Sequence, residues 1–255
     1  MLYLLLIIGC LTGLVTGLTG ASGMSILISG LLLAGLDIRE VIGLTFAVTF
    51  FNAGAAIGPY LKKGQWEPRV TWALGIPALV AVFLGHSLGR SASSGLLSGI
   101  VMVALLFAGI RFLSGKRSSE EKEPPEPREI PLVLLIGVGG VLGTIMGVMG
   151  GGGSIFISLL LVFGCRLPIR VALGSSIIIM GLAAIPGMVL NFRAEQLDPL
   201  SAILLIGPGM LASWGASRWA HRVPERGLET ILGVYLVVIS MVLFYTRILV
   251  PNFAG

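Results

Sequence analysis

The chain alternates between long apolar runs and short polar stretches. Two of the runs, residues 1–36 and 130–165, each hold 36 residues without an Asp, Glu, Lys, Arg or His. A straight helix of that length would measure about 54 Å, whereas the hydrocarbon core of a bilayer is about 30 Å thick. Each run is therefore predicted to break, and the glycines near its middle mark the place.

The other apolar stretches each have the length of one membrane-spanning helix. They are residues 41–61, 70–89, 91–110, 171–192, 199–217 and 227–246. The composition agrees, because 55% of the residues are hydrophobic and only 11% are charged. These stretches are continuous and do not alternate, which argues against a β-barrel. We predict an all-α integral membrane protein with about eight to ten transmembrane segments.

A segment of a different kind separates two halves. Nine of the 16 residues from 114 to 129 are charged and three are proline, so this segment is predicted to be a solvated cytoplasmic linker. Residues 1–113 then form a first membrane repeat and residues 130–255 a second.

The two halves share polar and turn-forming residues at a constant spacing. An offset of 131 positions pairs Ile38, Arg39, Gly43, Thr45, Gln65, Pro68 and Pro77 with Ile169, Arg170, Gly174, Ser176, Gln196, Pro199 and Pro208. The glycine-rich breaks pair at an offset of 130. We interpret this as an internal duplication.

The distribution of basic residues indicates how the halves are oriented. If each 36-residue run enters and leaves on one face, 13 of the 17 Lys and Arg residues fall on a single side. Cytoplasmic loops are enriched in these residues. This pattern favours inverted repeats, an arrangement that recurs in transporters with broken helices near the midplane.

The two breaks are the main candidates for a binding site. A helix that begins after a break presents unpaired N–H groups and a partial positive charge, which together attract an anion. The candidate residues are Gly20, Ser22, Gly23 and Ser25 in the first break and Gly150, Gly151, Gly152, Gly153 and Ser154 in the second. Ser25 and Ser154 are expected where the second half-helix starts. The alternative is that the glycines only allow close helix packing.

Polar side chains on neighbouring spans form a second group of candidates. Thr49, Asn52, Ser175 and Ser176 are expected to line the cavity, or else to bond within and between helices. Arg39 and Arg170 either attract an anion at the two mouths or anchor the protein to lipid headgroups. Pro77 and Pro208 mark either hinges or static kinks.

The missing residue types exclude several functions. No span interior contains an Asp, Glu, Lys or Arg, and the glycine-rich segments lack the Lys of a nucleotide-binding loop. We find no catalytic triad, no pair of buried carboxylates and no cluster of metal ligands. The net charge of +5 arises from residues that flank the spans. We expect no enzyme activity, no cofactor or metal, and no nucleic-acid partner; the lipid bilayer is the surrounding partner.

The pattern resembles the sulfite exporter TauE/SafE family of membrane permeases. The residues that carry the resemblance are Gly13, Gly17, Gly20 and Gly23, then Gly143, Gly147 and Gly150 to Gly153, followed by Arg39, Gly43 and Thr45, by Arg170, Gly174, Ser175 and Ser176, and by Pro77 and Pro208. The resemblance implies transport, usually outward across the cytoplasmic membrane, of a small sulfur oxyanion such as sulfite, sulfoacetate or another organosulfonate.

Physical reasoning is compatible with export. An anion that leaves a cell with a negative interior gains about 2.3 kcal/mol per charge per 100 mV, so no coupled ion is needed. An uptake permease or channel with another substrate remains an alternative, as does a non-transporting assembly subunit of the membrane. The sequence allows a homo-oligomer without requiring one.

Overall fold

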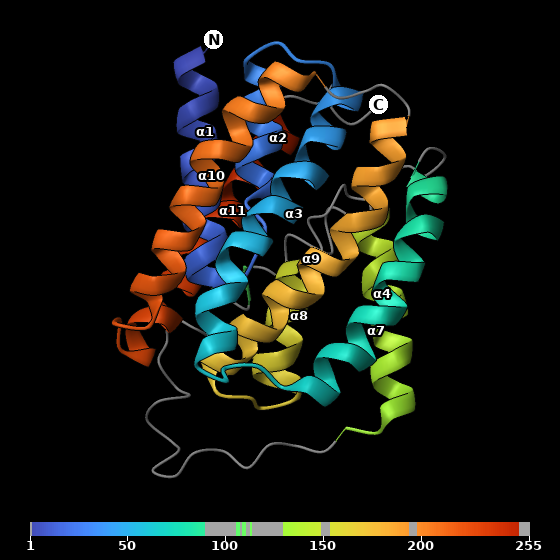
Figure 1. Ribbon diagram of the computed structural model, residues 1–255, viewed down its shortest axis with the longest axis vertical. Coiled ribbons are helices and arrows are strands. Elements are labelled where there is room, and N and C mark those ends of the chain that lie inside the picture. Colours follow the sequence, from blue (N-terminus) through green and yellow to red (C-terminus); the bar gives the residue numbers. More distant parts are fainter. Residues whose placement is uncertain are drawn as a thin grey trace. The chain divides into compact units, whose positions relative to one another are not determined.

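The computed structural model describes residues 2–89, 106–107, 109–110, 113, 130–148, 154–193 and 198–249. The first half contributes helices α1 (Leu2–Thr19), α2 (Met24–Leu33), α3 (Ile38–Lys62) and α4 (Pro68–Gly89), and the second contributes α7 (Leu132–Val148), α8 (Ser154–Leu159) with the π-helical turn η1 (Leu160–Gly164), α9 (Ile169–Arg193) and α10 (Pro199–Ala220) (Figure 1). The described part of the chain contains no strand. Helices α1, α3, α4, α9 and α10 are long and apolar enough to cross a membrane. The predicted all-helical membrane class is confirmed.

The repeat is visible in the lengths of the helices. Helices α3 and α9 both contain 25 residues, and α4 and α10 both contain 22. The first residues of each pair are 131 positions apart, which is the offset found in the sequence.

The chain divides into two compact units, one formed by residues 1–90 and 126–222 and the other by residues 91–125 and 223–255. The second unit contains α11 (Glu225–Leu249), which packs on Gly109: a Cβ added to this glycine would lie 2.8 Å from Val237 Cγ2. Most of the predicted span 91–110 and the whole predicted linker 114–129 lie outside the described residues. The repeat boundaries therefore remain a prediction.

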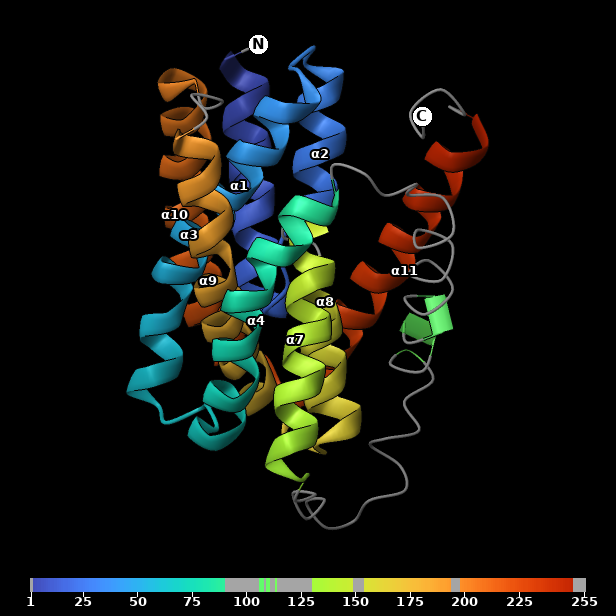
Figure 2. The same cartoon turned by 90° about the vertical axis from the view of Figure 1, so that its right-hand side faces the viewer.

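Each 36-residue run folds into a hairpin of two helices, as predicted. In Figure 1, α1 descends from the top of the view and α2 returns towards it, whereas α7 rises from the bottom and α8 returns there. The legs of the first hairpin are in contact, because a Cβ on Gly23 would lie 2.7 Å from Thr12 Cα. Figures 1 and 2 also show α9 running opposite to α3 and α10 opposite to α4. The orientation of the halves across a membrane remains a prediction.

The two halves are interlocked through glycines. On α1, Gly9, Gly13 and Gly17 face the backbone of α10 at Leu205, Gly209 and Ser213; on α7, Gly139, Gly143 and Gly147 face the backbone of α4 at Leu74, Ala78 and Val82. Every contact in one set has its counterpart in the other at an offset of 130 or 131 positions. The first helix of each half therefore packs on the fourth helix of the other half. The predicted close packing at glycines does occur along these two helices.

Candidate functional site

The two breaks meet inside the first unit. The backbone N–H of Ser22 donates a hydrogen bond to Ser154 Oγ at 2.8 Å, and the Ser154 hydroxyl donates to Ser22 Oγ at 3.1 Å. Ser22 is 6% exposed and Ser154 is fully buried. These bonds join residues 132 positions apart, so each half contributes one side of the same polar contact.

The first break is shaped by a single turn at Gly20. This glycine has a φ of +63°, a backbone conformation that favours glycine. Beyond it, Gly23 caps α2 without help from any side chain. The first backbone bond of the new helix runs from Ile26 N–H to the Gly23 carbonyl. The N–H groups before Ile26 therefore precede the hydrogen-bond ladder of the helix, as expected at a helix start.

Of the two serines predicted at helix starts, only one is the first residue of its helix. Ser154 is the first residue of α8, as predicted. Ser25 is the second residue of α2, and its side chain does not cap the helix, because the cap position belongs to Gly23. Gly150, Gly151, Gly152 and Gly153 lie outside the described residues.

Helix α9 brings one of its two predicted serines to the first break. The Ser176 hydroxyl lies within hydrogen-bond distance of the Gly20 carbonyl at 3.0 Å and of the Leu173 carbonyl at 2.9 Å. Ser175 Oγ instead accepts a bond from the backbone N–H of Glu67 at 2.9 Å, which fixes the start of α4. Ser176 therefore lies at the first break, whereas Ser175 supports the loop between α3 and α4.

The residues that meet at the contact are uncharged. Gly20, Ala21, Ser22, Ser154 and Ser176 are all buried. The start of α2 and the start of the apolar helical segment 154–164 supply the local positive potential through their backbone dipoles. This environment suits a small anion that binds through hydrogen bonds.

Thr49 and Asn52 on α3 carry buried oxygens without a hydrogen-bond partner, namely Thr49 Oγ1 and Asn52 Oδ1. Both residues are at most 2% exposed. Asn52 faces α10, where its carbonyl accepts a bond from Ser213 Oγ at 2.8 Å. Thr45, one turn earlier, bonds its hydroxyl to the Val41 carbonyl of its own helix. Thr49 Oγ1 and Asn52 Oδ1 therefore each have room for a further hydrogen bond, whereas the Thr45 hydroxyl is satisfied within its own helix.

Sequence reasoning missed Tyr60 and His221. The Tyr60 hydroxyl donates to the Gly17 carbonyl at 3.2 Å, three residues before the turn at Gly20. The Tyr60 ring packs edge-on against His221, with centroids 4.8 Å apart. Neither residue shares its type with its counterpart in the other half, so a search for matched pairs does not find them.

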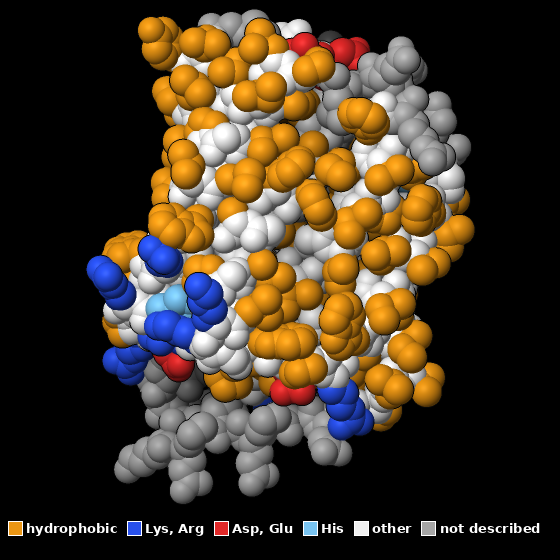
Figure 3. Space-filling view, viewed as in Figure 1, with side chains coloured by type: hydrophobic (Ala, Val, Ile, Leu, Met, Phe, Trp, Pro, Cys, Tyr) orange, Lys and Arg blue, Asp and Glu red, His pale blue; other side chains and the backbone are white. Residues whose placement is uncertain are grey.

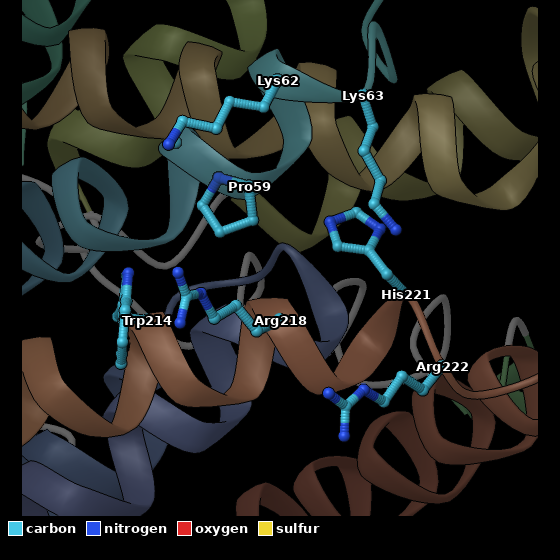
Figure 4. A pocket seen from close by; sticks show the side chains of 8 residues that line it. Pro59, Lys62, Lys63, Trp214, Arg218, His221 and Arg222 are labelled. Atoms are coloured by element: carbon cyan, nitrogen blue, oxygen red, sulfur yellow. The ribbon is translucent and has the colours of Figure 1, made fainter.

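A basic cavity of about 400 Å³ opens where α3 and α10 end. Its lining residues are Gly58, Pro59, Lys62, Lys63, Trp214, Arg218, His221 and Arg222 (Figure 4). In the space-filling view, Lys and Arg side chains surround a histidine on this face (Figure 3). Burial lowers the pKa of His221 below its ordinary value, and the charges of Lys63 and Arg170 lower it further. Arg170 lies in the first turn of α9, and its role at a mouth remains a prediction.

The remaining candidates concern the mouths and the kinks. The side chain of Arg39 lies outside the described residues. Pro77 and Pro208 lie inside α4 and α10, as predicted, and Pro59 and Pro186 lie inside α3 and α9. Whether any of these prolines acts as a hinge remains a prediction.

Comparison with known proteins agrees with this architecture. The family described as sulfite exporter TauE/SafE matches residues 5–243. The chain belongs to this family. Proteins from two strains of Xylella fastidiosa, Temecula1 and 9a5c, each called a probable membrane transporter protein, are 28% identical to it over 178 residues, which is 68% of this chain and 67% of theirs. The predicted resemblance is confirmed, and this TauE/SafE member is a multi-pass membrane transporter and not an enzyme.

Proposed function

We propose that this TauE/SafE protein exports a small sulfur-containing oxyanion, such as sulfite, sulfoacetate or another organosulfonate, across the cytoplasmic membrane. The observation that carries the proposal is the direct contact between Ser22 and Ser154, which brings the starts of two half-helices to one buried place. Two such starts attract negative charge without a cationic side chain. The anion binds there through backbone N–H groups, and the Ser154 hydroxyl leaves Ser22 Oγ to donate to the anion instead.

The charges at the two ends of the first unit support outward transport. Lys62, Lys63, Arg69, Arg166, Arg170, Arg218 and Arg222 lie at or next to the helix ends at the bottom of Figure 1, together with the acidic Glu67. Asp37, Glu40 and Asp198 lie at the opposite end, where α3 also carries Arg39 in its first turn and α9 ends at Arg193. By the positive-inside tendency, the basic end faces the cytoplasm. An anion that leaves from that end moves down the membrane potential.

The test is flux in proteoliposomes that contain the purified protein. Sulfite, sulfoacetate, thiosulfate, sulfate and chloride are loaded in turn, first with an imposed membrane potential and then with a pH gradient. The proposal predicts saturable, potential-driven efflux of a sulfur oxyanion. A requirement for the pH gradient would favour coupled uptake, and folded protein without any flux would favour an assembly subunit.

Replacing Ser154 by alanine is expected to raise the KM for the transported anion about tenfold, because a hydrogen bond to a charged group contributes roughly 1.5–3 kcal/mol. Ser217→Ala is the matched control: Ser217 is fully buried, but its hydroxyl bonds only to the Trp214 carbonyl of its own helix. Initial rates of efflux across a range of substrate concentrations measure the effect. Equal KM values for the two variants would contradict the proposed site.

Thr49→Val tests the unpartnered oxygen on α3. The substitution preserves shape and removes no hydrogen bond within the protein, so we expect thermal stability to stay the same or rise slightly. If the hydroxyl contacts the passing anion, flux falls several-fold. Thr45→Val, one turn away, is the control, because that hydroxyl is already bonded to its own helix. A flux loss of the same size in both variants would assign Thr49 a structural role.

A further inference from the structure

We propose that the basic cavity at the ends of α3 and α10 is a second oxyanion-binding site, which collects the anion from the cytoplasmic side before it reaches the breaks. This recruitment role rests on the proposed function, whereas binding of an oxyanion in the cavity does not. The lining residues supply the first argument. Lys62, Lys63, Arg218 and Arg222 come from two helix ends, and the described lining contains no acidic residue.

The cations are arranged around a defined space. Trp214 and Arg218 are four residues apart and lie along one face of α10, whereas Arg222 follows the helix, which ends at Ala220. The Arg218 guanidinium lies 3.9 Å from the centroid of the Trp214 ring, which holds this flexible side chain in place. Figure 4 shows the Lys63 amine beside the His221 ring, across the cavity from this pair. A guanidinium held in this way suits the planar recognition of sulfonate, sulfite or phosphate oxygens.

His221 adds a hydrogen-bonding ring to the basic lining of the cavity. Both of its ring nitrogens are buried, and the ring lies beside the Pro59 carbonyl, which interacts with it. Tyr60 on α3 packs on the ring, and Lys63 after α3 and Arg170 on α9 lie close enough for their charges to act on it; Arg218 and Arg222 line the same cavity. With one N–H beside the Pro59 carbonyl, the second ring nitrogen donates to an oxyanion when the imidazole is protonated.

The cavity is linked to the central site by one side chain. Tyr60 packs against His221 on one side and donates to the Gly17 carbonyl on the other. Gly17 lies three residues before the turn at Gly20, where Ser176 binds. An anion in the cavity is therefore separated from the broken helix by the fully buried Tyr60 ring. Because Tyr60 contacts both the cavity and the broken helix, we favour a free oxyanion over a lipid headgroup as the occupant of the cavity, although both have the same binding chemistry.

The first test measures binding to purified protein in detergent. Ethanesulfonate, sulfate and phosphate serve as probes, and tryptophan fluorescence reports binding because Trp214 lines the cavity. We expect a saturable change that disappears in Trp214→Phe and weakens about tenfold or more in the double variant Arg218→Gln/Arg222→Gln. The control is Arg166→Gln/Arg226→Gln, which removes the same charge from residues that do not line the cavity. Equal weakening in both double variants would overturn the site.

The second test distinguishes a free oxyanion from a lipid headgroup. It also distinguishes the recruitment site from the proposed export function. Micelles with phosphatidylglycerol or phosphatidylcholine replace the free probes, and a response to phosphatidylglycerol alone would overturn recruitment in favour of a lipid site. In proteoliposomes, the Arg218→Gln/Arg222→Gln variant is expected to raise the KM about tenfold and to leave the maximal rate within about twofold. An unchanged KM would overturn recruitment. Oxyanion binding without flux in the unmodified protein would support the site and contradict the proposed export.

Discussion

Gly13→Ala and Gly143→Ala are each expected to destabilise the folded protein by about 3 kcal/mol, at the upper end of overpacking costs. A Cβ at Gly13 would lie 2.9 Å from Gly209 Cα, and one at Gly143 would lie 2.5 Å from Ala78 Cα. The obstacle in both cases is backbone, which cannot move aside as the end of a flexible side chain would. The helices would have to separate along the contact that joins the two halves. Unfolding in detergent, followed by heat or by denaturant, measures the loss.

Gly140→Ala is the matched control for Gly143. The two glycines are three residues apart on α7, but nothing lies within 4 Å of a Cβ built on Gly140. Alanine at this position is expected to be neutral or to stabilise the helix by up to about 1 kcal/mol, because glycine is the poorer helix former. If Gly143→Ala were as stable as Gly140→Ala, the interlocked packing of α7 on α4 would be wrong.

The sequence alone predicted the helices and the breaks well. Span lengths are set by the distance between charged turns, so α3, α4, α9 and α10 begin and end within three residues of the predicted stretches. The two breaks followed from the mismatch between 36 apolar residues and the thickness of a bilayer. The pairing of the halves followed from residues at a constant offset, because a duplication preserves the positions of turns.

The packing partners of the helices could not be predicted in the same way. A helix that is apolar all round gives no indication of which face meets which neighbour. The spacing of Gly9, Gly13 and Gly17 indicates a close contact, but not that α10 from the other half provides it. The same limit explains why Ser175 and Ser176 were grouped, although their hydroxyls bond to different loops.

Tyr60 and His221 were missed for a related reason. Both act through tertiary contacts between residues more than 40 positions apart, with Tyr60 meeting Gly17 and His221. The usable signal was the spacing of Trp214, Arg218 and Arg222 beside the paired lysines at the end of α3. Read as one helical face, these residues predict a basic surface, but only the fold places Lys62 and Lys63 opposite them.

Gly20→Ala is expected to give the largest loss of transport. Alanine at a φ of +63° costs about 1–2 kcal/mol in backbone strain. Its Cβ would also lie 2.5 Å from Ser176 Oγ and 2.9 Å from the Leu173 carbonyl oxygen. The Ser176 hydroxyl would have to leave the Gly20 carbonyl, and α9 would have to move away from the first break. Because this displacement acts on the contact where the two breaks meet, we expect efflux to fall at least about tenfold, measured in proteoliposomes with equal amounts of folded protein.

Gly64→Ala is the control that distinguishes the effect of backbone strain from the effect of displacing Ser176 and α9. Gly64 has a φ of +62°, almost the same as that of Gly20, but nothing lies within 4 Å of its added Cβ. The control should therefore lose the same stability from backbone strain while keeping its efflux rate. If both variants lost stability and kept transport, the geometry around Gly20 would not matter for the passage of the anion. If only Gly20→Ala lost transport, the loss would come from the displaced Ser176 and Leu173, and the binding site would lie at the first break.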